Sequence, residues 1–228
     1  MQKVFDTLEN CRYSVLSDSD DLDKIFRLRY DSYLAEDAIL KNERKVMSDP
    51  YDESPNCVHV AVEMDGEYIA ALRLHLLSNT VPVSPTLEVF PEIRDRLDSG
   101  QTMLDPTRFV VRPGSKKSFL PLHLVTLRIP FLAAVSYDVD IVLAAVRAEH
   151  SAFYRRYLGC HNSVDPRPYP GLTKPIGLMM TIMEESRDKV LEKYPFFGRL
   201  DSIPQSEIQF PMLPGFYRIV ERPASRVA

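Results

Sequence analysis

The chain has 228 residues, 45% of them hydrophobic, and its 28 Lys and Arg against 32 Asp and Glu give a formal net charge of −4. That content suffices for a packed core and excludes a disordered or fibrous chain. The longest apolar run, residues 129–135, is far shorter than the roughly 20 residues of a membrane helix, and residues 1–10 lack a secretory pattern. A cytoplasmic protein without a membrane span is expected.

Several kinds of site are excluded by what the sequence lacks. The three cysteines are odd in number and widely spaced, which indicates neither a disulfide framework nor a redox motif. The five histidines have no ligand spacing, so no metal is predicted. No phosphate-binding glycine loop, serine-hydrolase elbow or zincin motif is present.

Charge is distributed unevenly along the chain. Residues 1–100 hold 11 basic and 20 acidic side chains, whereas residues 101–228 hold 17 basic and 12 acidic ones. The second part therefore suits an acidic partner. A nucleic-acid partner is not predicted, because the whole chain is acidic and its basic runs are short.

The first predicted helix begins after Ser17, where capping residues precede apolar side chains at helical spacing up to Tyr33. Arg29 lies on the same apolar stripe. Its guanidinium must meet an acid or a ligand there, unless the stem packs and the head reaches solvent.

A hairpin and a central strand follow. Two β-rich runs, 58–64 and 67–77, flank Asp65-Gly66, a dipeptide typical of a hairpin turn. A proline-rich loop, a short polar helix at 92–97 and a central strand at 103–111 come next.

The second part alternates helices and strands. The expected elements are a helix at 119–137 that Pro130 should kink or divide, a buried strand at 140–146, a helix at 149–158 ended by Gly159, a strand at 176–183 and a polar helix at 184–194. The apolar residues after Pro204 predict a tail that docks on the body. This order predicts one mixed α/β (α+β) domain over residues 1–228, with a core at about 12–185 and a C-terminal helix and docking tail at 184–228.

Charged residues interrupt three otherwise apolar patterns. They are the pair Asp49 and Asp52, Arg73 within a strand, and Asp105 with Arg108 at the central strand. Because a charge in a central strand needs a partner, the fold must bring these residues together with Arg29. A structural ion-pair network and a catalytic site both fit this pattern.

The ordered set of these residues resembles a known family. Phe26, Arg29 and Tyr33, then Asp49 and Asp52, Arg73, and Asp105-x-x-Arg108-Phe109 are similar to the motifs of acyl-homoserine-lactone synthases. The strings HSAFYRRYLGC and RPYPGL resemble the related N-acyl amino acid synthases, a branch of the GNAT acyltransferase fold. The resemblance covers residues 12–185 and implies a GNAT-like acyl-CoA N-acyltransferase fold, with a mixed, mostly antiparallel central sheet flanked by helices.

The resemblance implies transfer of a fatty acyl group from a phosphopantetheine thioester to a primary amine. The amine attacks only when unprotonated, so a base must stand near it. Asp105 takes the position where the lactone synthases carry Glu. Its shorter side chain predicts a proton relay rather than direct contact.

The thioester itself needs donors and an acid. Backbone N–H groups of Val110 and Val111 are the candidates for stabilising the oxyanion. Tyr154, at the acid position of the Phe-Tyr pair, is expected to protonate the departing thiolate, with Tyr157 as the fallback. The alternative is that Tyr154 is a packed aromatic whose hydroxyl is already bonded.

The other matching positions are predicted to bind substrate. Arg29 with Asp49 or Asp52 would fix the N-terminal segment that closes over the acyl chain, and Arg73 would face the acceptor's carboxylate. Tyr33, Arg108 and Phe109 belong to the same predicted set.

The stretch 112–121 contains only Gly114, whereas coenzyme-A-dependent relatives carry a glycine-rich loop there. This favours acyl-phosphopantetheine on an acyl carrier protein as the donor over acyl-coenzyme A, and no cofactor held by the protein itself. The basic side chains expected to dock the carrier protein are Arg112, Lys116, Lys117, Arg147, Arg155 and Arg156. An ordinary solvated basic surface fits them too. An apolar stripe is expected to line the acyl tunnel or to pack in the core: Phe119, Leu122, Leu124, Leu127 and Phe131.

Three functions remain open. The first is synthesis of an N-acyl amino acid or similar amide from acyl carrier protein and a small amine. The second is an acyl-homoserine-lactone synthase, which would also cyclise its product. The third is a non-catalytic module that binds acyl carrier protein or lipid.

Overall fold

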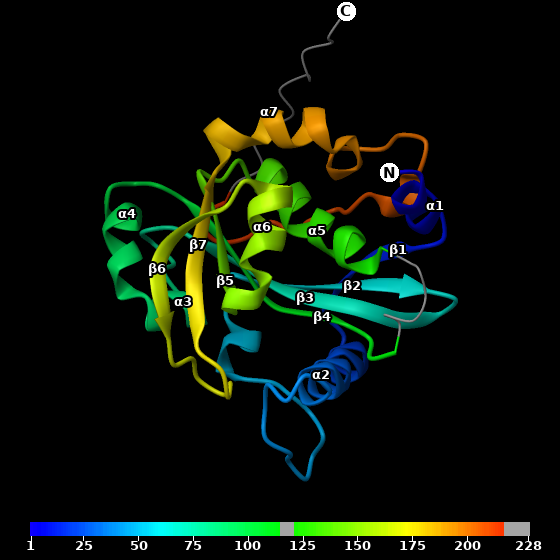
Figure 1. Ribbon diagram of the computed structural model, residues 1–228, viewed down its shortest axis with the longest axis horizontal. Helices are drawn as coiled ribbons and strands as arrows, with labels where there is room; N and C mark the ends of the chain where they lie inside the picture. Colours follow the sequence, from blue (N-terminus) through cyan, green and yellow to red (C-terminus); the bar gives the residue numbers. More distant parts are fainter. Residues whose placement is uncertain (115–120, 217–228) are drawn as a thin grey trace, which may run out of the picture.

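A seven-stranded sheet organises the computed structural model, which describes residues 1–114 and 121–216 (Figure 1). Neighbouring strands are antiparallel except for β4 and β5, which are parallel. Across the sheet the order is β1 (Arg12–Leu16), β2 (Cys57–Met64), β3 (Glu67–Leu77), β4 (Met103–Val111), β5 (Ile141–Val146), β7 (Ile176–Ile182) and β6 (His161–Arg167). The predicted mixed, mostly antiparallel sheet is confirmed.

The β2–β3 hairpin turns at the predicted dipeptide. Asp65 and Gly66 have φ angles of 53° and 79°, so both central residues are left-handed, as the twist of a two-residue hairpin requires. Pairing from Met64↔Glu67 to Cys57↔His75 then sets which side chains share a face.

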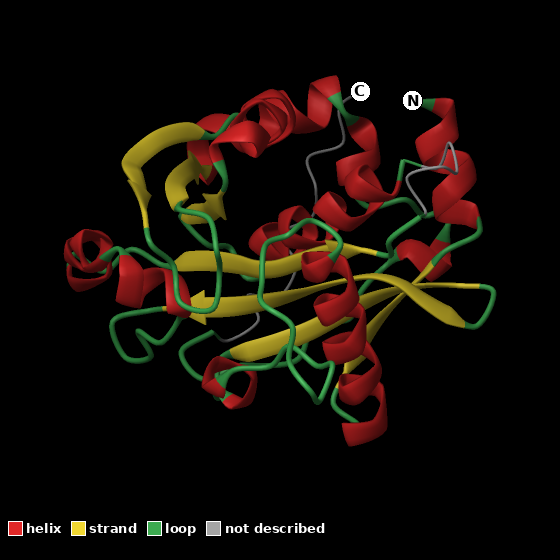
Figure 2. Cartoon of the chain, turned by 60° about the horizontal axis from the view of Figure 1, so that its bottom comes forward, coloured by secondary structure: helices red, strands yellow, loops and turns green. Residues whose placement is uncertain are grey.

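Helices cover both faces of the sheet (Figures 1 and 2). One face carries α2 (Ser19–Leu34), η1 (Pro50–Glu53), α3 (Pro85–Val89), η2 (Pro91–Ile93) and α4 (Arg94–Asp98). The other carries α1 (Gln2–Glu9), α5 (Leu122–Ser136), η4 (Ala148–His150), α6 (Ser151–Leu158), α7 (Met183–Lys193), η5 (Pro195–Phe197) and η6 (Pro204–Ser206). In the described ranges, no helix has the length and apolar character needed to cross a membrane.

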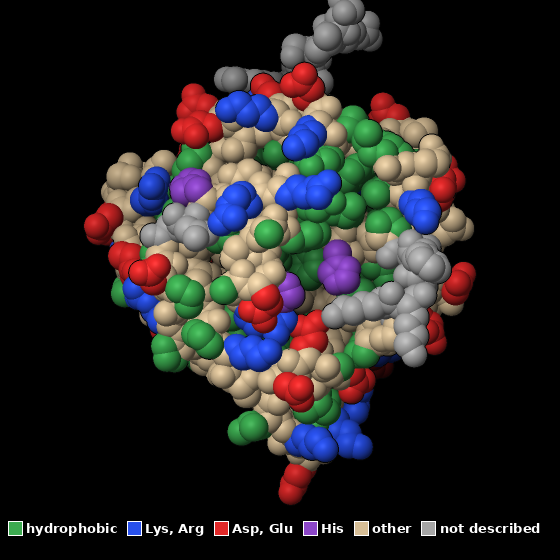
Figure 3. Space-filling view, in the orientation of Figure 1, with side chains coloured by type: hydrophobic (Ala, Val, Ile, Leu, Met, Phe, Trp, Pro, Cys, Tyr) green, Lys and Arg blue, Asp and Glu red, His purple; other side chains and the backbone are tan. Residues whose placement is uncertain are grey.

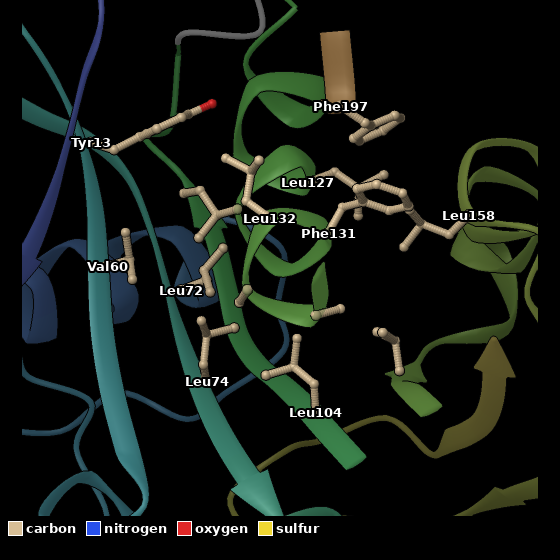
Figure 4. Close-up of a cluster of buried hydrophobic side chains, with 14 of the residues drawn as sticks. Tyr13, Val60, Leu72, Leu74, Leu104, Leu127, Phe131, Leu132, Leu158 and Phe197 are labelled. Atoms are coloured by element: carbon tan, nitrogen blue, oxygen red, sulfur yellow. The ribbon is translucent and has the colours of Figure 1, made fainter. Parts of the chain in front are cut away.

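The main core lies between the sheet and α5 (Figure 4). Leu72 and Leu74 of β3 and Leu104 of β4 point toward the helix, where Leu127 and Phe131 meet them. All five side chains are almost completely buried. Burying such side chains stabilises a fold by about 1.5–3 kcal/mol each, so this contact fixes α5 on the sheet.

The C-terminal tail docks on the body through Arg128 of α5. This guanidinium is fully buried and donates hydrogen bonds to the carbonyls of Phe196, Gly198 and Ser206 and to Glu207. The tail buries apolar side chains up to Phe216, while Met212 is exposed, and the apolar residues from Tyr217 onward lie outside the described ranges.

Two details differ from the sequence predictions. Pro130 does not divide α5, which continues through it from Leu122 to Ser136. The strands β1 and β6 and the helix α1 had no sequence prediction. β6 contains Asp165 and Pro166, residues that are rare in strands, and as an edge strand it can leave the proline nitrogen without a partner.

Candidate active site

Five charged side chains converge on the α2 face of the sheet. Asp52 binds Arg29 at 2.7 Å and Arg73 at 2.8 Å, and Asp49 binds Arg73 at 2.6 Å and Arg108 at 2.5 Å. They come from α2, η1, β3 and β4, so five of the six charged residues singled out from the sequence form one network in space. We call these five residues the arginine–aspartate cluster. Asp105, the sixth, lies outside this network and binds the Thr86 hydroxyl instead.

The spacing of the two aspartates follows from their place on η1. The Asp49 side chain accepts a hydrogen bond from the Tyr51 N–H, and the Asp52 side chain accepts one from the Asp49 N–H at 2.8 Å. This is the reciprocal capping of a short helix by residues three apart. Both carboxylates are thereby held rigidly toward the sheet.

Burial and the neighbouring arginines shift the pKa values of the two aspartates in opposite directions. Burial alone would raise the pKa of Asp49, but Arg73 and Arg108 outweigh it and hold the pKa below its ordinary range. The pKa of Asp52 is lowered in the same way, chiefly by Arg29 and Arg73 against its burial. Both aspartates are therefore ionised at neutral pH.

His59 completes the inner side of the cluster, and sequence reasoning missed it. Its Nδ1 lies 3.1 Å from Arg29 Nη2, and its Nε2 lies 3.0 Å from the Asp52 carbonyl oxygen. Burial, and next the charge of Arg29, lower the pKa of His59, so the ring accepts from Arg29 as a neutral imidazole. Its one signal in the sequence is its place in the β2–β3 hairpin, where it lies directly opposite Arg73.

The position of Arg73 corrects one prediction. Its side chain has no exposed surface, and its donors meet Asp49, Asp52 and the Thr107 hydroxyl. Arg73 therefore holds the cluster together and does not face an acceptor's carboxylate.

Arg108 lies at an irregularity in β4. Ala71 pairs with Val110 and Arg73 with Thr107, so Leu72 alone lies opposite both Arg108 and Phe109. This is a β-bulge, and Arg108 adopts a φ of +54°, which is unusual outside glycine. The bulge turns this arginine toward both Asp49 and the cavity described next.

A cavity of about 430 Å³ lies where β4 and β5 diverge. The two strands pair only at Met103↔Ile141 and Leu104↔Val142. Beyond these pairs, residues 106–111 of β4 and 142–146 of β5 line opposite walls. The volume is within the range of small-molecule sites.

The cavity passes through the sheet and is lined from both faces. On the α2 side it meets Ser32, Tyr33, Glu36, Ala38, Leu172 and Lys174, and on the α5 side His123, Pro130, Phe153, Tyr154 and Leu158. Figure 3 shows histidine and cationic side chains around a hollow lined by hydrophobic ones, on the α6 side. Tyr33 and Phe109, both predicted to bind substrate, line this cavity.

The backbone of β4 presents one of the two predicted oxyanion donors to the cavity. The Arg112 N–H donates to the Ile69 carbonyl of β3 at 2.8 Å. Because N–H groups alternate along a strand, the Val111 N–H points away from β3, toward the gap, whereas the Val110 N–H points toward β3. Val111 therefore has the geometry that the prediction requires, and Val110 does not.

Tyr154 lies in the cavity wall on α6. Its ring packs edge-on against Phe153 at 5.4 Å, and its hydroxyl has no hydrogen-bonding partner within residues 1–114 and 121–216. Burial raises the pKa of Tyr154, so it carries its proton at neutral pH. Tyr157, the fallback acid, instead packs in tilted contacts against Tyr194 and Phe153 and is not among the residues lining the cavity.

Asp105 is fully buried and lies behind the cavity wall. One carboxylate oxygen accepts from the Thr86 hydroxyl at 2.8 Å, and the other has no partner in the described part of the chain. Burial raises the pKa of Asp105, and the nearby Ser84 and Thr86 hydroxyls offset this only in part. Tyr169, whose hydroxyl lies 3.5 Å from that of Thr86, closes this polar group.

The predicted carrier-docking residues divide into three sets. Arg147 lines the cavity and pairs with Glu36 and Glu149, while Arg155 and Arg156 lie exposed on α6. Arg112 pairs with Glu67 at the end of β4. Lys116 and Lys117 lie outside the described residues.

Of the two roles expected for the apolar stripe, the described residues take the second, packing in the core. Leu122, Leu127 and Phe131 are buried in the core between α5 and the sheet, Leu124 packs against the same core, and Phe119 lies outside the described ranges. The cavity meets α5 at His123 and Pro130. The spacing of apolar residues in a sequence does not distinguish those that face the core from those that face a gap in the sheet.

A known protein family matches most of the chain. The N-acyl amino acid synthase FeeM family matches residues 24–182, which is more than two thirds of the chain. No curated protein matches the chain.

Solved structures share the fold at low sequence identity. FeeM, an N-acyl amino acid synthase from uncultured soil microbes, is 14% identical with a TM-score of 0.65, over 80% of this chain and 96% of that one. BjaI, a CoA-dependent acyl-homoserine lactone synthase, is 18% identical with a TM-score of 0.60, over 86% and 98%. The AHL synthase LasI is 17% identical with a TM-score of 0.55, over 75% and 89%. With the match across most of its length, the chain belongs to the N-acyl amino acid synthase FeeM family and has the GNAT-like fold of acyltransferases.

Proposed function

We propose that this protein transfers a long-chain fatty acyl group from an acyl carrier protein to the amine of an amino acid or related small amine. The observation that carries the proposal is the cavity through the sheet, with the Val111 N–H directed to it from β4 and Tyr154 in its α6 wall. Such a gap can hold an extended thioester between a backbone donor and a weak acid.

The reaction assigns a task to each group. The amine nitrogen attacks the thioester carbonyl, and the oxygen of the tetrahedral intermediate accepts from the Val111 N–H. The carbon–sulfur bond then breaks, the amide forms, and the thiolate takes a proton from Tyr154. The attacking nitrogen loses a proton, and Asp105 would receive it only through a relay because it lies behind the cavity wall.

The carrier protein as donor is supported by the basic residues beside the cavity. Arg147 lines it, and Arg155 and Arg156 follow Phe153 and Tyr154 on the same helix. A small acidic carrier would meet these side chains while its phosphopantetheine arm enters beside α6.

One incubation series tests the proposal. The protein is mixed with C12 to C16 chains carried either on acyl carrier protein or on coenzyme A, together with a panel of L-amino acids and simple amines, and mass spectrometry detects the amide. Amide from the carrier-bound chain is expected. Equal turnover with coenzyme A would contradict the carrier assignment, and a cyclised product would identify a lactone synthase.

A binding measurement covers the remaining outcome. Tight carrier binding in the absence of any amide would support a non-catalytic module and overturn the enzyme proposal.

A further inference from the structure

The loop between α2 and η1, residues 35–49, presents an apolar side chain to solvent. Leu40 is 80% exposed, the largest exposed fraction among the large hydrophobic side chains that the structure describes. Its neighbour Ile39 is buried beside Tyr30 and Met47, so the chain turns one apolar residue inward and holds the next one outward. Figure 1 shows this loop projecting below α2, away from the sheet.

Three cationic side chains follow Leu40 within five residues. Lys41, Arg44 and Lys45 are all exposed, and within residues 1–114 and 121–216 none of them forms an ion pair. Glu43 is the single acidic residue in the run 38–47. Figure 3 shows Lys and Arg side chains at the lower end of the molecule, where the loop projects. An exposed leucine beside an excess of positive charge favours a partner that is both anionic and apolar.

Hydrogen bonds on either side of Leu40 hold the loop in place. The Met47 N–H donates to the Phe26 carbonyl of α2 at 3.0 Å. On the other side, the Thr173 N–H donates to the Ala38 carbonyl at 3.0 Å. A partner that binds Leu40 therefore does not have to order the loop first, which removes one entropic cost of binding.

The same loop lies beside the cavity. Ala38 lines the cavity on its α2 side, together with Leu172 and Lys174, which flank the threonine that binds Ala38. Lys174 is exposed and adds a further positive charge next to the loop. Whatever docks on the loop is therefore held close to the α2 side of the cavity.

We propose that this loop docks on an anionic lipid bilayer, with Leu40 among the acyl chains and the three cationic side chains at the headgroups. A bilayer accepts one projecting apolar side chain, whereas a protein interface needs a more extended complementary patch. A single leucine with a few cations gives weak, reversible binding that salt screens.

The docking goes beyond the proposed function, but its use rests on that function. A long-chain acyl amide is an amphiphile that partitions into lipid through its buried methylene groups. A cavity held at a bilayer surface can release such a product directly into it.

The first test measures co-sedimentation of the unaltered protein with vesicles. Phosphatidylcholine vesicles with about one third phosphatidylglycerol should bind the protein at low salt, and phosphatidylcholine alone should bind it more weakly. Salt at about 0.5 M should release the protein from the mixed vesicles. Absence of binding to the mixed vesicles at low salt, or equal binding to both kinds, would overturn the proposal. Because the assay needs no acyl donor, its failure leaves the proposed acyltransferase standing.

The second test assigns the apolar part of the binding to Leu40. Leu40→Ser should weaken the affinity for the mixed vesicles by about 10-fold. Met212→Ser is the matched control, because it changes a side chain that is 67% exposed on the C-terminal tail. The control should keep the affinity of the parent. Equal losses in the two variants would mean that Leu40 does not enter the bilayer.

The third test concerns the charges. The double variant Lys41→Gln/Lys45→Gln should weaken vesicle affinity by about 25-fold, since each cation near an anionic surface contributes a factor of about five. The control Lys189→Gln/Lys193→Gln removes the same charge from exposed positions on α7, on the opposite face of the sheet, and should change the affinity by less than about 2-fold. A similar loss in the control would show a diffuse effect of net charge and refute the loop as the docking surface.

Binding of acyl carrier protein separates a lipid surface from an acidic protein partner. The carrier should bind the Lys41→Gln/Lys45→Gln variant as tightly as it binds the parent. Loss of carrier affinity with unchanged vesicle affinity would assign the loop to the carrier and overturn the lipid assignment.

Discussion

Within the arginine–aspartate cluster, each buried charge is neutralised by a partner of opposite sign. Asp49 has its carboxylate between Arg73 and Arg108, and both arginines are buried. Removing one acidic partner leaves two guanidinium groups short of a counter-charge in a medium that solvates them poorly.

The Asp49→Asn variant should therefore lose about 3–5 kcal/mol of unfolding free energy. The asparagine keeps the shape of the side chain and removes its charge. Urea denaturation followed by circular dichroism measures the loss. Asp188→Asn, at an exposed position beside Arg187, is the control and should stay within about 0.5 kcal/mol of the parent. A loss of similar size in both variants would contradict a special role for Asp49.

Tyr154 offers a separate test of chemistry without a large effect on folding. Because its hydroxyl has no partner in the described ranges, Tyr154→Phe removes an acid and breaks no internal hydrogen bond. We expect kcat to fall by about 100-fold while the thermal midpoint stays nearly constant. Release of the carrier thiol reports kcat, and undiminished release would remove Tyr154 from the mechanism.

Asp105 differs from Tyr154 because it does not line the cavity. Asp105→Asn should lower turnover while carrier binding is retained. The change removes the proposed acceptor of the relayed proton and leaves the protein surface unaltered. Amide yield and carrier affinity are measured on the same preparation. Unchanged turnover would show that Asp105 only holds Thr86 in place.

At the scale of elements, the sequence predicts turns and helix ends, because a few neighbouring residues determine their conformation. The β2–β3 hairpin follows from Asp65-Gly66, and α6 ends at the left-handed Gly159. β6 was missed because its stability comes from pairing with β7 and not from its own composition.

The candidate site was predictable only in part, for a related reason. Charges on apolar stripes predict that Arg29, Arg73 and the aspartates must meet, because burial requires it. The same pattern does not predict which of the arginine side chains contacts solvent or substrate. The bulge that brings Arg108 to the cavity, and the loops that bring Glu36 and Lys174 beside it, depend on tertiary contacts that leave no period in the sequence.

The contribution of the contact between α5 and the tail to the unfolding free energy can be measured. Arg128 supplies donors to three backbone carbonyls of the tail, so Arg128→Met would leave them buried without partners. We expect a loss of at least about 3 kcal/mol in unfolding free energy by urea denaturation. Arg94→Met, which breaks an exposed ion pair with Asp98, should cost less than about 1 kcal/mol. Comparable losses would show that the tail docks by apolar contact alone.

At the scale of the whole molecule, a buried histidine links stability to pH. His75 is fully enclosed on the α2 face, and burial, followed by the charge of Arg73, lowers its pKa to about 3. The unfolded chain binds a proton at this histidine below about pH 6.5, whereas the folded chain does not until about pH 3. His75 therefore reduces stability progressively as the pH falls through that window. Asp105, whose pKa is raised by burial, acts in the opposite direction.

The contribution of His75 can be isolated by difference. The unfolding free energy of the parent minus that of His75→Gln should shrink by up to about 1.4 kcal/mol per pH unit below about pH 6.5. Urea denaturation at several pH values measures it. A flat difference for His75 would mean that its ring takes up a proton at the same pH in the folded and in the unfolded chain.

The short pairing of β4 with β5 has a kinetic consequence. Because the residues that line the cavity come from both faces of the sheet, the proposed donor and acceptor would approach it from opposite sides, without obstructing each other. The two reactants can then be present together in a ternary complex, reached in either order, with no acylated intermediate of the protein between them. Double-reciprocal plots at fixed concentrations of the second reactant should accordingly intersect, whereas parallel lines would indicate a ping-pong exchange.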